Sequence, residues 1–531
     1  MKKNNLVIYL FLVLPALLLQ SCLKDQEDVF DSSSSARMEE YLNKAKTVLM
    51  NSEQGWILDY YPHANRIYGG YAYTIKFTKN AAEIRYEREP GKKETCLYSM
   101  KTNNGPELSF DTYSPMMHFF ATPSSDLYEA LGGDFEFVID SIGNDRIKLH
   151  GKRSQNVMYM RKLTDTAADY QEKVIDMGDT FYLAGSDGTI GGKSVHFDFD
   201  VVSRQIKIAT ENGAVETAYN YTDKGIRLYE PLVINGTEVS ELTYDESKMT
   251  LAAANVDLNK GWQSPQSVVD VIQSIGSDDK AFSRSYDNIK HLSEFKFETD
   301  ADWLTFIKSG DKLTVETTSN ATGEIRSAVV NVVNGNYSAS FTVTQCEVTD
   351  ILGDYSFSYL NKDDERIEVP AKLTLAGEAV RLTFQEDGFD TPFALPLRFD
   401  QGRGALVLSG GYIGKFKNYN MIASFLFAGG SYVTFSNKES ISAPFQRNDE
   451  QGVFAAFAGK VSNTDIEAII IWASNKTEPK NFNDTEGYLC WLTSPVLVKK
   501  AAGGAKEWVP SIGKSPKRSN REFPASIKRV K

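Results

Sequence analysis

The strongest constraint on the fold is a change of apolar period at Gly55. Before it, apolar residues recur every three or four positions from Met38 to Leu49, the spacing of one helix face. After it, apolar and polar residues alternate, as in 71–77 and around Phe137, and glycine-containing turns separate the runs. The pattern predicts one amphipathic helix followed by many antiparallel strands.

The helix has expected ends as well as an apolar face. Ser35 can cap its first turn, and Glu39 and Glu40 suit the positive end of the helix dipole. Gly55 can end it, because glycine adopts the left-handed backbone that often follows a helix.

The first 22 residues have the pattern of an export signal. Two lysines precede an apolar run of 14 residues, 6–19, which is too short to span a hydrocarbon layer of about 30 Å. The run ends in Leu19-Gln20-Ser21-Cys22, which resembles the lipobox of bacterial lipoproteins. The resemblance implies cleavage before Cys22 and a lipid on its thiol. The alternative is ordinary secretion with an incidental cysteine.

The residues after Cys22 bear on location. Residues 23–28 are mostly charged, and serines occupy 32–35. The segment resembles the acidic tether that sends Bacteroidetes lipoproteins to the outer face of the outer membrane, which implies a lipid-anchored protein exposed on the cell surface. Any polar linker would look similar, so an anchor facing the periplasm is the alternative.

Composition limits the partners. The chain has 58 basic and 70 acidic residues, a net charge of −12, so we expect no nucleic-acid partner. The basic end, 499–531, is interpreted as a solvated, disordered tail. Besides Cys22, only Cys96, Cys346 and Cys490 remain, far apart, so we expect isolated buried thiols and no disulfide framework.

The expected fold class is mainly β: several antiparallel β-sandwich or barrel-like domains with one N-terminal amphipathic helix. A chain of 531 residues fits three or four domains at about 150 residues each. The expected order is a signal peptide at 1–21, a flexible tether at 22–35, a helix with β-meander domains at 36–258, a linker with one short helix at 259–287, a β-sandwich at 288–347, a C-terminal β domain at 348–498 and the tail at 499–531.

Two segments resemble known families. Between about 31 and 251, ordered motifs resemble the Bacteroidetes lipoproteins of domain-of-unknown-function family 4302, among them Gly55-Trp56-Ile57-Leu58-Asp59-Tyr60-Tyr61-Pro62, Asp111-Thr112-Tyr113 and Gly132-Gly133-Asp134-Phe135. Between about 288 and 345, Ala301-Asp302-Trp303-Leu304 and Phe341-Thr342-Val343-Thr344-Gln345 resemble a BACON module, the Bacteroidetes-associated carbohydrate-binding, often N-terminal domain. The second resemblance implies an immunoglobulin-like sandwich with Trp303 in its core. A carbohydrate role is proposed for that family, although some members serve as spacers.

The densest candidate binding group is aromatic. Trp56, Tyr60, Tyr61 and Tyr68 lie within 13 residues, close to Tyr71 and Tyr73. Aromatic rings pack against the C–H faces of sugars, and phenol groups hydrogen-bond to hydroxyls. Ligand contact at these four residues is one hypothesis, and packing in a core is the alternative.

The other candidate motifs give weaker evidence for a binding or catalytic site. His196, Asp198 and Asp200 alternate, so they share one strand face and could bind a metal, but a polar solvent face explains the same spacing, and we expect no metal. The glycine-rich run 188–194 is interpreted as a hairpin turn, so no nucleotide or other cofactor is expected. No nucleophile motif is present, and an unrecognised carboxylate pair is the one remaining route to hydrolysis.

The function expected is therefore that of a non-catalytic surface lipoprotein that assists glycan or nutrient capture, beside an outer-membrane transport complex. A structural or adhesive surface protein, with the BACON-like module as a spacer, is the alternative. A glycan hydrolase is the third hypothesis.

Overall fold

The computed structural model describes residues 33–103, 105–123, 130–386, 388–427, 433–448, 452–461, 464–480, 482–500 and 529. The expected signal peptide at 1–21, Cys22, most of the tether and nearly all of the tail lie outside these residues. The chain forms two compact units, one from 1–60, 73–118 and 134–171 and the other from 61–72, 119–133 and 172–531.

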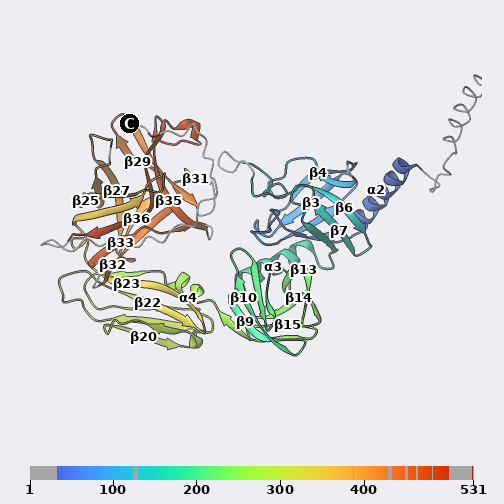
Figure 1. Cartoon of the computed structure of the whole chain (residues 1–531), viewed down its shortest axis with the longest axis horizontal. Coiled ribbons are helices and arrows are strands. Elements are labelled where there is room, and N and C mark those ends of the chain that lie inside the picture. Colours follow the sequence, from blue (N-terminus) through green and yellow to red (C-terminus); the bar gives the residue numbers. More distant parts are fainter. Residues whose placement is uncertain are drawn as a thin grey trace, which may run out of the picture. The chain divides into compact units, whose positions relative to one another are not determined.

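The amphipathic helix is confirmed as α2 (Ser34–Met50), which buries Leu42, Ala45 and Leu49 (Figure 1). Its cap is Ser33 and not Ser35, because Ser34 and Ser35 already lie in the first turn. Asn51 follows the last turn in place of Gly55, since its N–H already bonds to carbonyls in that turn. In the described part of the chain, no helix combines the length and the apolar character needed to cross a membrane.

Eight antiparallel strands close into the first barrel in chain order, with β1 pairing to β8. The period-two pattern explains them, since alternate residues such as Ile75 and Phe77 point into the core. The strands are β1 (Trp56–Tyr60), β2 (Tyr71–Phe77), β3 (Ala81–Tyr86), β4 (Glu94–Thr102), β5 (Pro106–Phe110), β6 (Glu136–Ile142), β7 (Arg146–Gly151) and β8 (Val157–Lys162).

A second closed barrel follows helix α3 (Ala167–Thr180). Phe181 fills its core, with its ring 4.9 Å from Tyr244 and 5.2 Å from Phe199. The glycine-rich run is the hairpin turn expected, at Gly191 and Gly192 between the first two strands. The strands are β9 (Leu183–Ile190), β10 (Lys193–Asp200), β11 (Gln205–Thr210), β12 (Gly213–Tyr221), β13 (Gly225–Ile234), β14 (Thr237–Asp245), β15 (Thr250–Ala253) and β16 (Val256–Gln263).

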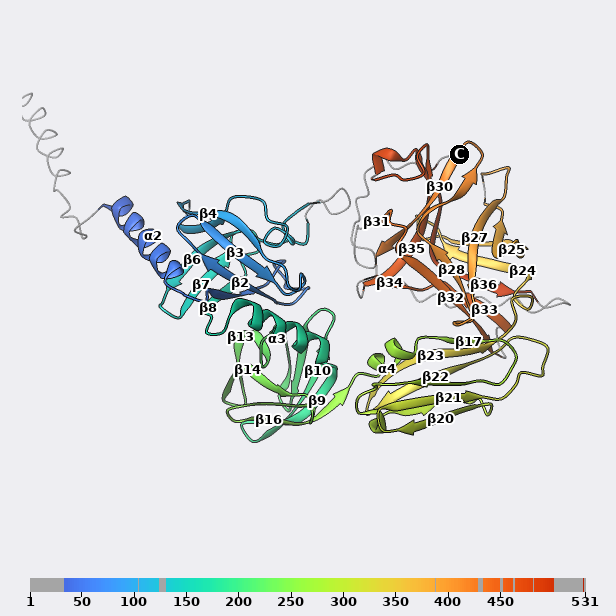
Figure 2. The same ribbon diagram turned by 180° about the vertical axis from the view of Figure 1, so that it is seen from behind.

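The next domain is a two-sheet sandwich, which we call the module. One sheet has the order β17-β23-β22-β19 and the other β18-β21-β20. Helix α4 (Pro265–Ile272) packs on β22 and β23 (Figure 2). The elements are β17 (Ile275–Ser277), β18 (Ser283–Tyr286), a short 3-10 helix (Leu292–Glu294), β19 (Lys296–Glu298), β20 (Leu304–Ser309), β21 (Lys312–Thr317), β22 (Arg326–Asn334) and β23 (Tyr337–Gln345).

Two expectations for this region are corrected. The segment 259–287 is not a linker, because it contains the end of β16, helix α4 and two module strands of three and four residues, which are too short to show an alternating pattern. Trp303 does not fill the core. It is only partly buried, with the Arg326 guanidinium 4.3 Å from its ring, and residues such as Phe295 and Phe341 occupy the core.

The C-terminal domain is one large antiparallel sheet that curls until β24 pairs with β36. Its core includes Tyr355, Phe357, Phe393 and Leu497. Its elements are β24 (Gly353–Leu360), β25 (Arg366–Ala376), β26 (Ala379–Phe384), β27 (Phe393–Asp400), β28 (Ala405–Ser409), β29 (Gly411–Phe416), β30 (Tyr419–Phe427), β31 (Val433–Thr434), β32 (Ser440–Asn448), β33 (Gly452–Ala456), β34 (Lys460–Val461), β35 (Thr464–Ser474), a 3-10 helix (Phe482–Asp484) and β36 (Gly487–Lys499).

Candidate functional site

The aromatic residues expected to contact a ligand are mostly buried. Trp56 and Tyr60 are fully buried and Tyr61 is 2% exposed. The Trp56 indole N–H donates to the Leu49 carbonyl at 2.9 Å. The Tyr60 hydroxyl donates to the Asp134 carbonyl at 3.0 Å and accepts from the Asp134 N–H at 2.7 Å. Burial of these three rings favours the alternative, core packing, over ligand contact.

Of the four, only Tyr68 reaches the surface. It is partly exposed, and its ring lies edge-on to His63 with 6.0 Å between centroids. Burial raises the pKa of its hydroxyl. The nearby Tyr73 is buried and stacks on Tyr86 at 4.4 Å. Of the four candidate ligand-binding residues, three are therefore buried and Tyr68 is partly exposed.

The alternating residues of β10 serve local structure. His196 lies between two carboxylates, with Nδ1 2.7 Å from Asp187 Oδ1 and Nε2 3.1 Å from Asp198 Oδ1. Asp200 accepts hydrogen bonds from the backbone N–H groups of Val202 and Ser203 in the following turn. Among the described residues, no group of three or more histidine, cysteine or acidic side chains is arranged to hold a metal ion.

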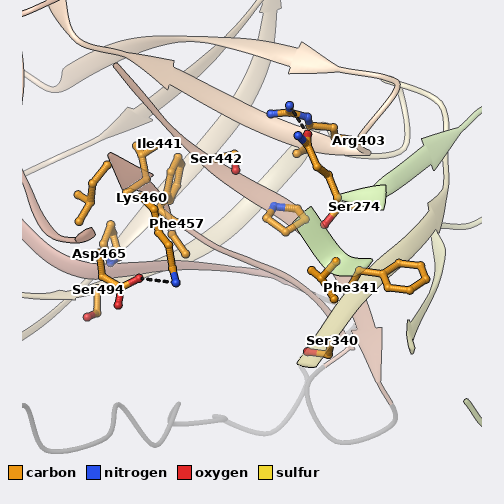
Figure 3. A pocket seen from close by; sticks show the side chains of 18 of the residues that line it. Ser274, Ser340, Phe341, Arg403, Ile441, Ser442, Phe457, Lys460, Asp465 and Ser494 are labelled. Carbon is orange, nitrogen blue, oxygen red and sulfur yellow. Dashed lines mark hydrogen bonds and ion pairs between the residues drawn. The ribbon is translucent and has the colours of Figure 1, made fainter. Parts of the chain in front are cut away.

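A cavity of about 600 Å³ lies between the module and the C-terminal domain (Figure 3). On the module side its walls are α4, the two residues between α4 and β17, and β23. On the other side they are Arg403 and the first residue of β28, part of β32, residues 457–460 and 465–469, and a short part of β36. Ligand pockets commonly have volumes of about 300–1,000 Å³, so the cavity has the size of a binding site.

Part of the cavity lining is apolar. Val269 and Phe341 contribute from the module, and Ile441, Phe457 and Ile466 contribute from the C-terminal domain. Neutral hydrogen-bonding groups also line the cavity, among them the hydroxyls of Ser274, Ser340, Ser442 and Ser494 (Figure 3). A ligand with both apolar faces and many hydroxyls would satisfy such a lining.

Charged side chains of the cavity lining have polar or oppositely charged partners. Arg403 donates to the side-chain oxygen of Gln273 at one end, and Lys460 lies 3.7 Å from Asp465 at the other (Figure 3). Asp270 accepts from the Gln266 amide at 2.7 Å. With Glu467, the lining has three carboxylates against two cations. It therefore provides no concentration of positive charge for phosphate groups.

Close backbone contacts hold the two walls together. The Gly276 N–H donates to the Gly402 carbonyl at 2.7 Å, and the buried Thr344 hydroxyl donates to the Phe445 carbonyl at 2.7 Å. A Cβ on Gly276 would lie only 1.9 Å from the Gly404 nitrogen. Glycine at this position allows the two domains to approach, and the approach fixes the shape of the cavity.

A separate aromatic group lies at the surface of the first unit. The rings of Tyr113 and Phe135 flank His118, with centroid distances of 5.3 and 4.7 Å. Tyr113 is 65% exposed and Phe135 36%. Burial lowers the pKa of His118. These rings lie outside the cavity.

No sequence signal marks the cavity. Its residues come from segments near 270, 340, 404, 442, 465 and 494, and each segment is an ordinary strand, helix or turn. Only the packing of module against C-terminal domain brings them together.

Two family models match the chain. Residues 26–246 match DUF4302, described as "Domain of unknown function (DUF4302)", and residues 293–346 match BACON, described as "Putative binding domain, N-terminal". Both resemblances expected from the sequence are confirmed. No curated protein matches the chain, and no solved structure does. The module wall of the cavity, including Ser340 and Phe341, falls partly within the BACON match.

Proposed function

We propose that this chain is a non-catalytic lipoprotein of the outer membrane that captures a glycan at the cell surface, in the cavity between the module and the C-terminal domain. The observation that carries the proposal is the lining of that cavity. Sugars can present C–H faces to apolar lining residues such as Phe341 and Ile441, and hydroxyls to the serines and amides of the same lining.

The charge of the lining narrows the ligand class. Arg403 and Lys460 each have a neutral or acidic partner within the cavity. An anionic ligand would have to compete with Asp465 for Lys460 and would meet two further carboxylates. A neutral oligosaccharide meets no such penalty and is the ligand class proposed.

The lipid anchor rests on the sequence before Ser33. Cys22 follows a short apolar run and a small residue, the order of a lipobox, and a charged segment comes after it. Two or more acyl chains anchor a protein stably, where a single chain gives marginal binding. Anchored in this way on the outer face, the cavity would be placed to supply a glycan to an outer-membrane transport complex.

A glycan array tests the binding proposal. The chain starting at Ser33 is compared with its Ser340→Trp variant, in which an indole fills the cavity. Ser338→Trp is the matched control, since Ser338 is exposed on the same strand but does not line the cavity. We expect native chain and control to bind the same glycans and Ser340→Trp to lose them. Equal binding by all three would place the ligand elsewhere, with the Tyr113 surface as the next site to test.

The anchor is tested separately. Cells expressing the full chain are fed labelled palmitate, and Cys22→Ser is the control. We expect palmitate label on the native chain and none on Cys22→Ser. We also expect protease added to intact cells to remove the folded domains of the native chain from the cell surface. Absence of label would refute the anchor, and full protease resistance beside a cleavable control would refute surface exposure.

The two other hypotheses predict different results. A structural or adhesive protein predicts a folded chain that binds no glycan on the array. A hydrolase predicts product release from the bound glycan that is lost in Asp465→Asn, Asp270→Asn or Glu467→Gln. Binding without product release is the result expected here.

A further inference from the structure

The C-terminal domain buries a carboxylate against an arginine from the end of the chain. Glu386 follows β26, and its side chain is 8% exposed. One carboxylate oxygen accepts from the buried Tyr359 hydroxyl, and the other pairs with the guanidinium of Arg529. Arg529 is far along the chain from Lys500, the preceding described residue.

The site needs a cation. A carboxylate that is removed from water is costly unless a positive group compensates it, and the Tyr359 hydroxyl supplies only a neutral hydrogen bond. Burial, then the hydrogen bond and charge of Glu386, raise the pKa of Tyr359 well above its usual value, so this hydroxyl stays a donor.

The site also suits a planar cation. The Arg529 guanidinium carbon lies 5.1 Å from the centre of the Phe389 ring, a cation–π distance. Phe389 is itself held by Phe393 and Phe416, with centroid distances of 5.0 and 5.4 Å. Guanidinium stacks on aromatic rings and is more weakly hydrated than ammonium, so arginine fits better than lysine.

A backbone contact orients the bound arginine relative to β36. Arg529 forms a parallel β-bridge with Tyr488 at the start of β36. An extended peptide that runs parallel to β36 therefore presents its arginine to the carboxylate and the ring together. Strand addition of this kind gives affinity through the main chain and specificity through one side-chain site.

We propose that Glu386, Phe389 and the start of β36 form a binding site for an arginine on an extended peptide, and that the chain's own Arg529 occupies it as an exchangeable intramolecular ligand. This site is separate from the cavity between the module and the C-terminal domain, and the inference does not depend on the glycan proposal.

Peptide binding to the full chain tests this inference. The probe is a fluorescein-labelled peptide with the sequence of residues 524–531, and binding is followed by fluorescence anisotropy at low ionic strength. When Arg529 occupies the site of its own chain, only a fraction of the chains can bind an added peptide. The apparent affinity for that peptide falls in proportion to this fraction. We therefore expect the Arg529→Ala chain to bind the peptide at least about tenfold more tightly than the native chain. Lys528→Ala, which removes a neighbouring charge and keeps Arg529, should bind as weakly as the native chain.

One modified peptide and two further substitutions in the chain identify the contact. A peptide with citrulline in place of the arginine keeps the shape without the charge and should lose binding to Arg529→Ala. Adding Glu386→Gln or Phe389→Leu to Arg529→Ala should also weaken binding. If Glu386→Gln disturbs folding, as circular dichroism would show, the citrulline peptide and Phe389→Leu decide the question. Equal binding by native and Arg529→Ala chains, no binding to Arg529→Ala, or equal binding of the citrulline peptide would each overturn the proposal.

Discussion

The hydroxyl of Tyr337 in β23 donates to Asp198 Oδ1 in β10 at 2.8 Å, which joins the module to the second barrel. The same hydroxyl lies 3.2 Å from His196 Nε2. Gly185 makes room for it, because a Cβ there would lie 1.9 Å from the Tyr337 oxygen. The indole of Trp262 donates to Asp187, the other partner of His196. A small polar cluster thus holds the module against the second barrel.

This cluster predicts a pH-dependent stability. Burial lowers the pKa of His196, but hydrogen bonds and charges from Asp187 and Asp198 outweigh it, so the pKa lies above 6.5. Because the pKa of His196 is higher in the folded chain than in the unfolded chain, protonation of its ring stabilises the fold. This stabilisation is fully present below the unfolded-state pKa and is lost as the pH rises through the folded-state pKa. We expect the melting temperature of the native chain to fall relative to His196→Gln as the pH rises above about 6.5, the ordinary histidine pKa.

Tyr337→Phe is the control for that measurement. It removes the bridging hydroxyl and keeps the His196–Asp187 pair, so the melting temperature should drop while most of its dependence on pH remains. Parallel curves for native and His196→Gln chains across this range would contradict the assignment of the dependence to His196.

The buried Tyr60 hydroxyl predicts a large effect from a small change. Tyr60→Phe leaves the Asp134 N–H without the oxygen that accepts from it at 2.7 Å, and an unsatisfied buried donor costs about 1–3 kcal/mol. Tyr113→Phe changes a side chain that is 65% exposed and should shift stability by less than about 0.5 kcal/mol. Urea unfolding of both variants measures the difference. Similar midpoints for the two would mean that Tyr60 is not part of the core.

Gly276 predicts a link between domain packing and ligand binding. Gly276→Ala places a methyl group against the Gly404 backbone, and such overpacking costs about 1–3 kcal/mol. The walls of the cavity must then separate, so glycan affinity should fall together with the melting temperature. Gly402→Ala is the control, since its nearest neighbour, an Asp400 oxygen, is 3.4 Å away. Unchanged stability in Gly276→Ala would contradict the close approach.

The three thiols predict resistance to alkylation. Cys96, Cys346 and Cys490 are free and buried, as expected from their spacing. Burial raises the pKa of Cys96 to about 11 and of Cys346 to about 12, and raises that of Cys490 well above its usual value. Mass spectrometry of the chain starting at Ser33 should find no iodoacetamide adduct at pH 8, and three adducts in denaturant. Rapid modification of any of them in the native chain would show an open core.

The apolar period located the N-terminal helix and a number of the strands, but it did not reveal helix α3 within the segment expected to be β-meander. Runs such as 71–77 and 380–384 alternate over a full strand, whereas the pattern is absent from very short strands, as at Ile275–Ser277, and from strands buried on both faces, as at Trp56–Tyr60. The sequence could not separate a binding aromatic from a core aromatic. Trp56 and Tyr60 were expected at a ligand and are buried, whereas Trp303 was expected in a core and is partly exposed.

The candidate site could not be predicted at all. Phe341 and Phe457 have the same strand or loop surroundings as many other apolar residues of the chain. Their position in one cavity depends on the packing of two domains, which is set by contacts such as Thr344 to the Phe445 carbonyl. No local motif encodes a relationship of that kind.

The most direct test of the account is isothermal titration of the best-binding oligosaccharide from the array into the native chain, Ser340→Trp and Ser338→Trp. We predict saturable binding at one site per native chain, the same affinity for Ser338→Trp, and at least about a hundredfold loss for Ser340→Trp, about 2.7 kcal/mol of binding free energy. Undiminished affinity in a folded Ser340→Trp chain would contradict binding in the cavity.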